Sequence, residues 1–99
     1  MQKPKRRDRY IAFEVEDPRR VREVSLAFHA AVASWPKEER PSLVFIEGRR
    51  GLVRCGHLRK DEVVGLLNGL RAGSPPAAVR TVGASGTIRA ARTRYFSKR

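Results

Sequence analysis

Residues 10–16 read Tyr-Ile-Ala-Phe-Glu-Val-Glu, and this alternation decides the fold class. Ile11, Phe13 and Val15 fall on one face of a strand, and the residues between them fall on the other. A strand with this pattern is fully buried on one face only, as in an antiparallel sheet. The sequence therefore predicts an antiparallel sheet with helices packed on one of its faces.

A helix is expected directly after this strand, over residues 18–34. Asp17 provides a carboxylate that can accept hydrogen bonds from free backbone N–H groups, and Pro18 suits the first helical position. Apolar side chains recur every three or four positions along residues 21–35, which places them on one stripe. Pro36 disfavours helical geometry in the residue before it, so the helix is expected to end there.

Two further strands and a second helix follow. Residues 42–47 are apolar on both faces of the expected strand, so the second face needs a cover. A turn at residues 48–51 leads to a strand over 52–56, which makes a hairpin. Asp61 is expected to cap the next helix, whose apolar residues lie within 63–70.

The last part of the chain predicts a strand over residues 77–82 and a C-terminal helix. Ser85 is expected to cap this helix, with Ile88, Ala91 and Tyr95 on its inner side. The order strand, helix, strand, strand, helix, strand, helix indicates an α+β fold of the ferredoxin-like or RRM-like type. In that split β-α-β arrangement the helices cover one face of an antiparallel sheet, here with an extra C-terminal helix.

The composition predicts one domain with a polyanionic partner. A chain of 99 residues can bury a single core, so we expect a basic N-terminal arm over 1–9 and one domain over 10–99. The net charge is +12, and no carboxylate follows Glu62. Such an excess repels itself unless an anion relieves it, which makes nucleic acid the first candidate. With no apolar stretch long enough for a membrane span, and no signal peptide, we expect a cytoplasmic protein with no membrane partner.

Candidate catalytic groups are few. Glu14 and Glu16 share a strand face and could form an acid/base or metal-binding pair, but a solvated face that balances arginines is the favoured interpretation. Cys55 and His57 could suggest a nucleophile and its base, yet no third group orients them, so ordinary packing is favoured. We therefore expect no catalytic residue, no metal site and no bound cofactor in the protein.

The segment Gly83-Ala84-Ser85-Gly86 has two interpretations. It could cradle a phosphate at the start of the last helix, or it could be an ordinary turn. The arginines around it favour contact with RNA. A KH domain also clamps RNA with a Gly-x-x-Gly loop, but too little chain remains for that fold. The strand over 52–56 carries no aromatic residue, so recognition of shape and phosphate is expected rather than base stacking as in an RRM.

Three segments together carry a family resemblance: RYIAFEV at residues 9–15, VRCGH at 53–57 and VGASGTIRAARTRY at 82–95. With these segments the chain resembles the archaeal protein component 2 of ribonuclease P, the counterpart of the fifth "processing of precursor" subunit of eukaryotes. The chain departs from that pattern at Gly65 and Gly69 in the second helix and in the short connection 73–76.

The resemblance implies an RNA-binding subunit of an endoribonuclease in which the RNA carries the chemistry. That reaction is the Mg²⁺-dependent removal of the 5′ leader from precursor tRNA, and the Mg²⁺ is used by the RNA. The implied partners are the catalytic domain of ribonuclease P RNA, ribonuclease P protein component 3 and, indirectly, precursor tRNA. A homodimer and a heterotetramer with component 3 are both compatible with it.

The resemblance and the charge pattern together name two sets of candidate residues. The candidate RNA-binding residues are Lys5, Arg6, Arg7, Arg9, Tyr10, Ser85, Gly86, Arg89, Arg92, Arg94 and Lys98. The candidate residues for the protein partner are Leu43, Val44, Phe45 and Ile46. The alternative is a general RNA-binding module, such as a ribosome-associated protein, and a nuclease using Glu14 and Glu16 is a still weaker one. We expect the basic groups near the two termini to converge on one surface.

Overall fold

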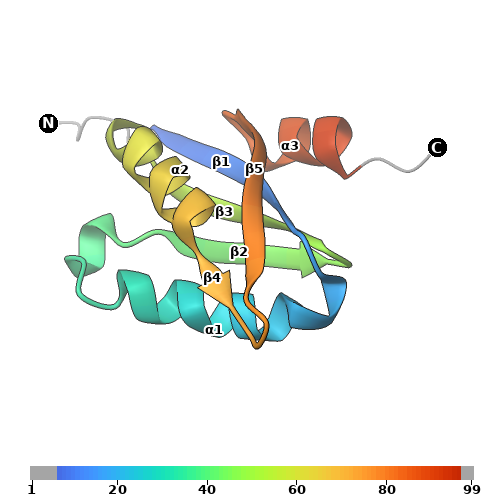
Figure 1. Cartoon of the computed structure of the whole chain (residues 1–99). Coiled ribbons are helices and arrows are strands. Elements are labelled where there is room, and N and C mark those ends of the chain that lie inside the picture. The colour runs from blue at the N-terminus through green and yellow to red at the C-terminus, as the bar shows by residue number, and fades with distance from the viewer. Residues whose placement is uncertain (1–6, 97–99) are drawn as a thin grey trace, which may run out of the picture.

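The computed structural model describes residues 7–96 of the chain. The elements follow in the order β1 (Asp8–Val15), the 3₁₀ turn η1 (Pro18–Arg20), α1 (Val21–Val32), η2 (Lys37–Glu39), β2 (Ser42–Glu47), β3 (Arg50–Gly56), η3 (His57–Arg59), α2 (Lys60–Gly69), β4 (Arg71–Ala72), β5 (Ala77–Ser85) and α3 (Ile88–Tyr95) (Figure 1). None of these helices is long and apolar enough to cross a membrane.

The strands of the described region form one antiparallel sheet in the order β2-β3-β1-β5-β4. Strand β1 lies in the middle, between β3 and β5. The α1 crossover joins β1 to β2 with β3 between them, and the α2 crossover carries the chain from β3 past β1 to β4 and β5, which is the split β-α-β arrangement. The predicted fold class is confirmed, and the short β4 adds an edge to it.

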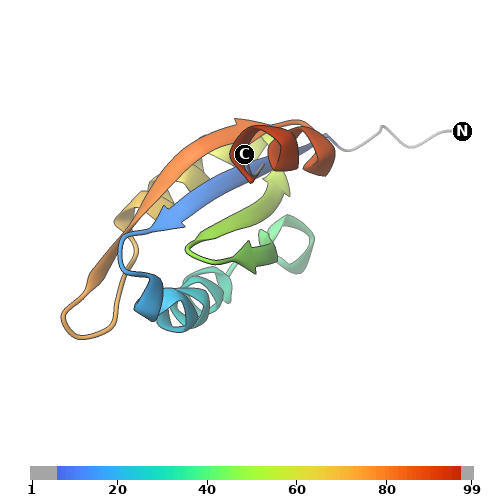
Figure 2. The ribbon, with the colours of Figure 1, turned by 90° about the vertical axis from the view of Figure 1, so that its right-hand side faces the viewer.

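The two faces of the sheet carry separate cores. On one face, α1 and α2 bury Ile11 and Phe13 of β1 together with Phe28 and Leu67 of the helices. On the other face, α3 packs over a small cluster built around Ala12, Leu52 and Ala91. Figure 2 shows α1 and α3 on opposite sides of the sheet. The extra helix thus covers the face that α1 and α2 leave open.

Gly83 allows α3 to lie close against the sheet. A Cβ at this position would lie 2.5 Å from Cζ of Tyr95, so any side chain here would push the tyrosine ring away. At the end of the helix, Arg50 donates from Nη1 to the carbonyl of Tyr95 at 2.7 Å. This bond satisfies one of the carbonyls that a helix C-terminus leaves free.

Of the three residues expected to cap a helix N-terminus, one does so and two do not. Asp17 does cap the first helical turn, because its carboxylate accepts from the backbone N–H of Arg19 at 3.0 Å. The prediction for Asp61 is wrong: α2 already begins at Lys60, and Asp61 lies inside its first turn. The prediction for Ser85 is also wrong and is treated with the site below.

Two strands are longer than expected, and both extensions lie at the same end of the sheet. Strand β1 begins at Asp8, two residues earlier than expected, and β5 runs on to Ser85 instead of ending at Val82. Both extensions have the same cause, because Tyr10 of β1 pairs with Ser85 and Asp8 pairs with Gly56 of β3. Pairing partners from distant segments thus lengthen strands that look shorter in isolation.

Candidate nucleic-acid interface

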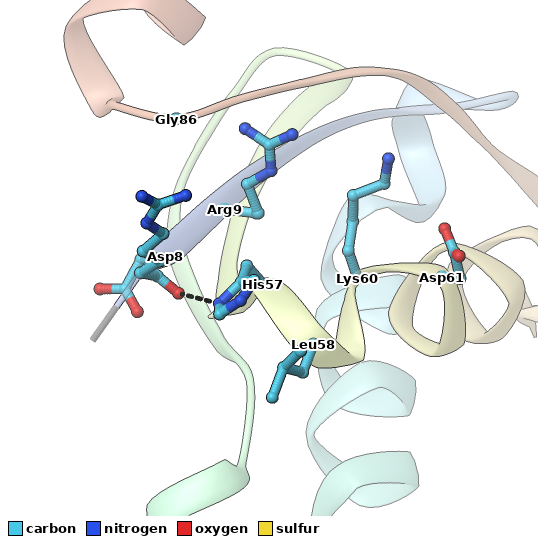
Figure 3. A pocket seen from close by; sticks show the side chains of 8 residues that line it. Asp8, Arg9, His57, Leu58, Lys60, Asp61 and Gly86 are labelled. Carbon is cyan, nitrogen blue, oxygen red and sulfur yellow. Dashed lines mark hydrogen bonds between the residues drawn. The ribbon is translucent and has the colours of Figure 1, made fainter. Parts of the chain in front are cut away.

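A groove of about 560 Å³ lies at the end of the sheet where β1 begins (Figure 3). We call it the β1 groove. It joins the start of β1, the start of α2 and the turn before α3, and it is lined by Arg7, Asp8, Arg9, His57, Leu58, Lys60, Asp61 and Gly86.

Strand pairing places the start of β1 beside the start of α2. Arg9 is the register partner of Cys55, the penultimate residue of β3. The backbone N–H of His57 then donates to the carbonyl of Arg7 at 2.9 Å, and Nδ1 of His57 lies 3.3 Å from the same oxygen. These contacts continue the ladder one step beyond the strands and bring Lys60 to the groove.

The turn before α3 reaches the same groove from the other side of β1. A Cβ added to Gly86 would lie 3.7 Å from Nη1 of Arg9. In Figure 3 the side chains of Arg9 and Lys60 extend toward the side on which Gly86 lies. Arg9 of the basic segment near the N-terminus and Gly86 of the turn that opens the C-terminal helix therefore lie side by side.

The cations of the β1 groove are free to take an anionic ligand. Arg7, Arg9 and Lys60 form no ion pair with any acid of residues 7–96. Asp8 and Asp61 also line the groove, so its own excess is modest, and the exposed arginines of α3 add to it. Guanidinium groups in such a setting can each grip two oxygens of a phosphate.

Helix α3 presents Arg89 and Arg94 to solvent. Together with Thr87 and Thr93 they line a shallow depression on the outer side of the helix. Both arginines are exposed, and neither pairs with an acid in the described part of the chain. They are therefore the α3 residues whose charge is available to a partner.

Arg92 lies on the same helix but is used by the fold. Its guanidinium carbon sits 4.3 Å from the centre of the Phe45 ring, and its Nη1 lies 3.1 Å from the carboxylate of Glu47. Arg92 was expected to bind RNA together with Arg89, but these contacts could not be foreseen from the sequence. They tie α3 to β2, and they occupy the charge of Arg92 within the protein.

The prediction that residues 83–86 form a phosphate-cradling turn is wrong, because residues 83–85 belong to strand β5. Gly83 is a strand residue beneath Tyr95, and Ser85 is a strand residue with only 5% of its surface exposed. The helix is capped instead by Thr87, whose hydroxyl accepts from the N–H of Ala90 at 3.0 Å. Ser85 was expected to cap the C-terminal helix, but its pairing with Tyr10 of β1 holds it in the strand.

Of the remaining candidates, Tyr10 is half-buried and packs at the border of the cluster beneath α3. Gly86 is exposed and stays within the β1 groove. Lys5, Arg6 and Lys98 lie outside the described residues.

Glu14 behaves as a structural carboxylate. Arg80 lies 2.6 Å from it, Arg49 3.3 Å and Arg50 3.7 Å. The hydrogen bond from Arg80 is the largest cause that lowers the pKa of Glu14, and the charges of Arg49 and Arg50 lower it further against the opposing effect of burial. A carboxylate held ionised in this way is a poor general acid, which supports the charge-balancing interpretation of Glu14.

Cys55 is buried, and burial raises the pKa of its thiol to about 11. A thiol with this pKa carries almost no thiolate at neutral pH and is a weak nucleophile. Cys55 packs in the core beneath α1 and α2, whereas His57 is exposed, which agrees with the packing interpretation of Cys55. Among residues 7–96, no three His, Cys, Asp or Glu side chains gather as a metal site.

The apolar strand β2 is covered on both faces by its own chain. Leu43 and Ile46 pack against the core beneath α1 and α2, and the ring of Phe45 lies 4.9 Å from that of Phe96, at the end of α3. A partner is therefore not needed as the cover. Val44 sits at an irregularity in the pairing with β3 and is 36% exposed, so it is the exposed apolar residue of this edge strand.

The sequence missed Lys60, His57 and Leu58 as members of the groove. They sit in a short basic run, His-Leu-Arg-Lys at residues 57–60, directly after the third strand. Only the pairing of β1 with β3 shows that this run lies beside Arg9. The run of basic residues was the available signal.

Comparisons with known proteins support the fold. No protein-family model matches the chain, and no curated protein matches it either. The structure is similar to a chain in the cryo-EM structure of yeast ribonuclease MRP, with a TM-score of 0.60 and 13% sequence identity over 89% of this chain and 80% of that chain. At this identity, the likeness establishes a shared fold.

Proposed function

We propose that the chain is an RNA-binding protein subunit of a ribonuclease P-type ribonucleoprotein. In this role it supports a catalytic RNA in the Mg²⁺-dependent removal of the 5′ leader from precursor tRNA. The Mg²⁺ is bound by the RNA, and the protein contributes cations that lower the repulsion between phosphates in the folded RNA.

The observation that carries the proposal is the β1 groove. It gathers Arg7, Arg9 and Lys60 beside Gly86, with Arg89 and Arg94 on the adjoining helix. These cations are free of ion pairs within the described chain, whereas many other arginines are neutralised by acids. A surface that leaves cations unpaired in a protein of charge +12 is suited to a polyanion.

Two further points support the ribonuclease P assignment over a general RNA-binding role. The fold likeness is to a chain of yeast ribonuclease MRP, whose name identifies it as a ribonuclease. The sequence segments at 9–15, 53–57 and 82–95 also resemble component 2, and they contribute Arg9, His57 and Gly86 to the groove. In this proposal component 3 is the protein partner, and it contacts the β2 edge at Val44.

Reconstitution tests the proposal directly. The chain, component 3 and the cognate ribonuclease P RNA are combined at low Mg²⁺, and cleavage of the 5′ leader from precursor tRNA is measured. We expect cleavage that depends on the chain, and a loss of that stimulation in the double variant Arg9→Gln with Lys60→Gln. The double variant Arg49→Gln with Arg80→Gln removes the same charge outside the groove and should still stimulate.

RNA binding without any stimulation of cleavage would favour the general RNA-binding module instead. Cleavage by the protein without RNA would favour a nuclease using Glu14 and Glu16, which the arginines around Glu14 argue against.

A further inference from the structure

A second groove of about 840 Å³ adjoins the β1 groove. It lies between η2 and the end of β3, and we call it the η2 groove. The two grooves share Arg7, Asp8, His57 and Leu58 in their walls, so they meet at η3. Besides Arg59, the cations that the η2 groove adds are Lys37, Arg40 and Arg54.

The cations of the η2 groove are available to a ligand. Arg54 and Lys37 are exposed, and neither forms an ion pair with an acid in the part of the chain that the structure describes. Arg40 donates from Nη2 to the carbonyls of Trp35 at 3.0 Å and Ala33 at 3.2 Å, which fixes its position without cancelling its charge.

One acid of the η2 groove, Glu39, is already paired with Arg59. Arg59 pairs with Glu39 and with Glu62, and its guanidinium lies 4.8 Å from the centre of the Trp35 ring. This cluster joins η2 to the start of α2 and leaves Glu38 and Asp8 as the remaining acids of the groove. Cations therefore exceed acids along the path from Arg7 to Lys37.

Leu58 stands where the grooves meet and is 87% exposed. In Figure 3 it projects away from the side on which Arg9 and Lys60 extend. Its exposed neighbours are charged or polar, so it lacks the contiguous apolar patch that forms the centre of a protein interface. A leucine among free cations instead suits the apolar face of a nucleobase, while the cations hold the phosphates on either side.

We propose that the two grooves form one continuous track for an RNA strand, with Leu58 packed against an unpaired nucleotide at the junction. The inference rests on the proposed RNA-binding function and adds Arg54, Lys37 and Leu58 to it. The nucleotide must be unpaired because bases within a duplex are stacked, and their faces are closed to side chains. The RNA taken by this surface is therefore a helix that continues into a single strand.

The test compares two RNAs with the full chain at about 0.15 M salt, an ionic strength that screens distant charges. One RNA is a fully paired hairpin, and the other carries a single-stranded extension of about six nucleotides, a length that such a track can hold. Extensions at the 5′ and 3′ ends are measured separately. We expect one of them to raise the affinity about tenfold, through added phosphate contacts and one base contact.

The variant Arg54→Gln changes a residue outside the β1 groove, so it should reduce this gain while binding the hairpin as wild type does. Adding Leu58→Ser should remove the rest of the gain. The matched control, Arg22→Gln with Leu26→Ser, changes an exposed arginine and a 65% exposed leucine on α1 and should keep the gain. The log–log salt slope of the extended RNA should be steeper in wild type by roughly 0.7 for each added phosphate contact.

A wild-type chain that binds the hairpin but gains nothing from either extension overturns the continuous track and leaves the proposed function standing. A gain that survives in the double variant of Arg54 and Leu58 also overturns it. A wild-type chain that binds neither RNA overturns the proposed function and the track together.

Discussion

The two ends of strand β1 use basic residues in opposite ways. At the C-terminal end, Glu14 holds Arg49, Arg50 and Arg80 within 3.7 Å, and Arg50 also bonds the end of α3. At the N-terminal end, Arg9 faces a groove in which, within residues 7–96, no acid pairs with it. The two ends differ because an acid, Glu14, lies within reach of the arginines at one end, and no acid pairs with Arg9 at the other end within residues 7–96.

This comparison shows why counting arginines overstates a binding surface. Arg89 and Arg92 are three residues apart on α3, and the sequence pattern names both as RNA-binding candidates. Arg92 packs on Phe45 and pairs with Glu47, whereas Arg89 points to solvent. A cation contributes to binding only where the fold leaves it without a partner, and the following predictions test that distinction.

The largest effect is expected at the seat of α3. Gly83→Ala places a methyl group against the ring of Tyr95 and should lower the free energy of unfolding by about 2 kcal/mol, the usual cost of overpacking. Gly65→Ala in α2 is the matched control, because nothing lies near its Cβ, and it should raise that free energy by about 1 kcal/mol. Urea denaturation measures both. Equal effects in the two variants would show that α3 is not seated on Gly83.

Glu14→Gln should have the next largest effect, a loss of about 1 to 2 kcal/mol in the free energy of unfolding at neutral pH, because several guanidinium groups lose their charged acceptor. The pKa of Glu14 is lowered in the folded state, so the unfolded state binds the proton first as pH falls. The stabilisation is complete above the ordinary pKa of 4.5 and is lost as pH falls through the lowered value.

Denaturation at several pH values should therefore show the wild type and Glu14→Gln converging in acid. The control Glu16→Gln alters the neighbouring exposed carboxylate, which accepts one hydrogen bond from the N–H of Ala78, and should change stability far less. A constant gap between the wild type and Glu14→Gln at every pH would contradict the role given to the charge.

At the free end of β1, the double variant Arg9→Gln with Lys60→Gln should weaken RNA binding about tenfold and reduce the log–log salt slope by roughly 1.4 to 1.8, the value for two phosphate contacts. Fluorescence anisotropy with a labelled RNA at several salt concentrations measures both quantities. Arg49→Gln with Arg80→Gln removes the same net charge at the paired end. If both double variants weaken binding alike, net charge rather than the groove explains affinity.

The smallest effects separate the two arginines of α3. Arg92→Ala should lower the free energy of unfolding by about 1 kcal/mol, because it removes the cation–π contact and a surface ion pair. Arg89→Ala should leave stability unchanged and weaken RNA binding about threefold, as expected for one lost phosphate contact. Thermal unfolding and binding assays on the same samples would expose a reversed pattern, which would return Arg92 to the RNA surface.

The predicted sheet was accurate where local pattern is strong. The alternation at residues 10–16 gave β1, and the apolar stripe with Asp17 gave α1, because both signals arise within one element. The predictions for Ser85 and Asp61 as helix caps were wrong. The position of a cap depends on the residue at which the preceding strand or turn ends and the helix begins. For Ser85 that point was set by pairing with Tyr10, which lies far away in sequence.

The candidate site was predicted only in part for the same reason. Arg9 and Arg89 could be named from the density of basic residues near the two ends of the chain, and Gly86 from the glycine spacing at residues 83–86. Lys60 could not be placed, because its position beside Arg9 follows from the register of β3 against β1. The role of Arg92 likewise required the packing of α3 onto the second face of the sheet.

The sequence by itself determined the order of elements, the burial of one face of β1 and the excess of positive charge, because these depend on periodicity and composition. The tertiary structure alone decided which cations are free, because an ion pair forms only when an acid from a distant segment comes within reach. It also decided that α3 closes the open face of the sheet, since that packing depends on the space above Gly83.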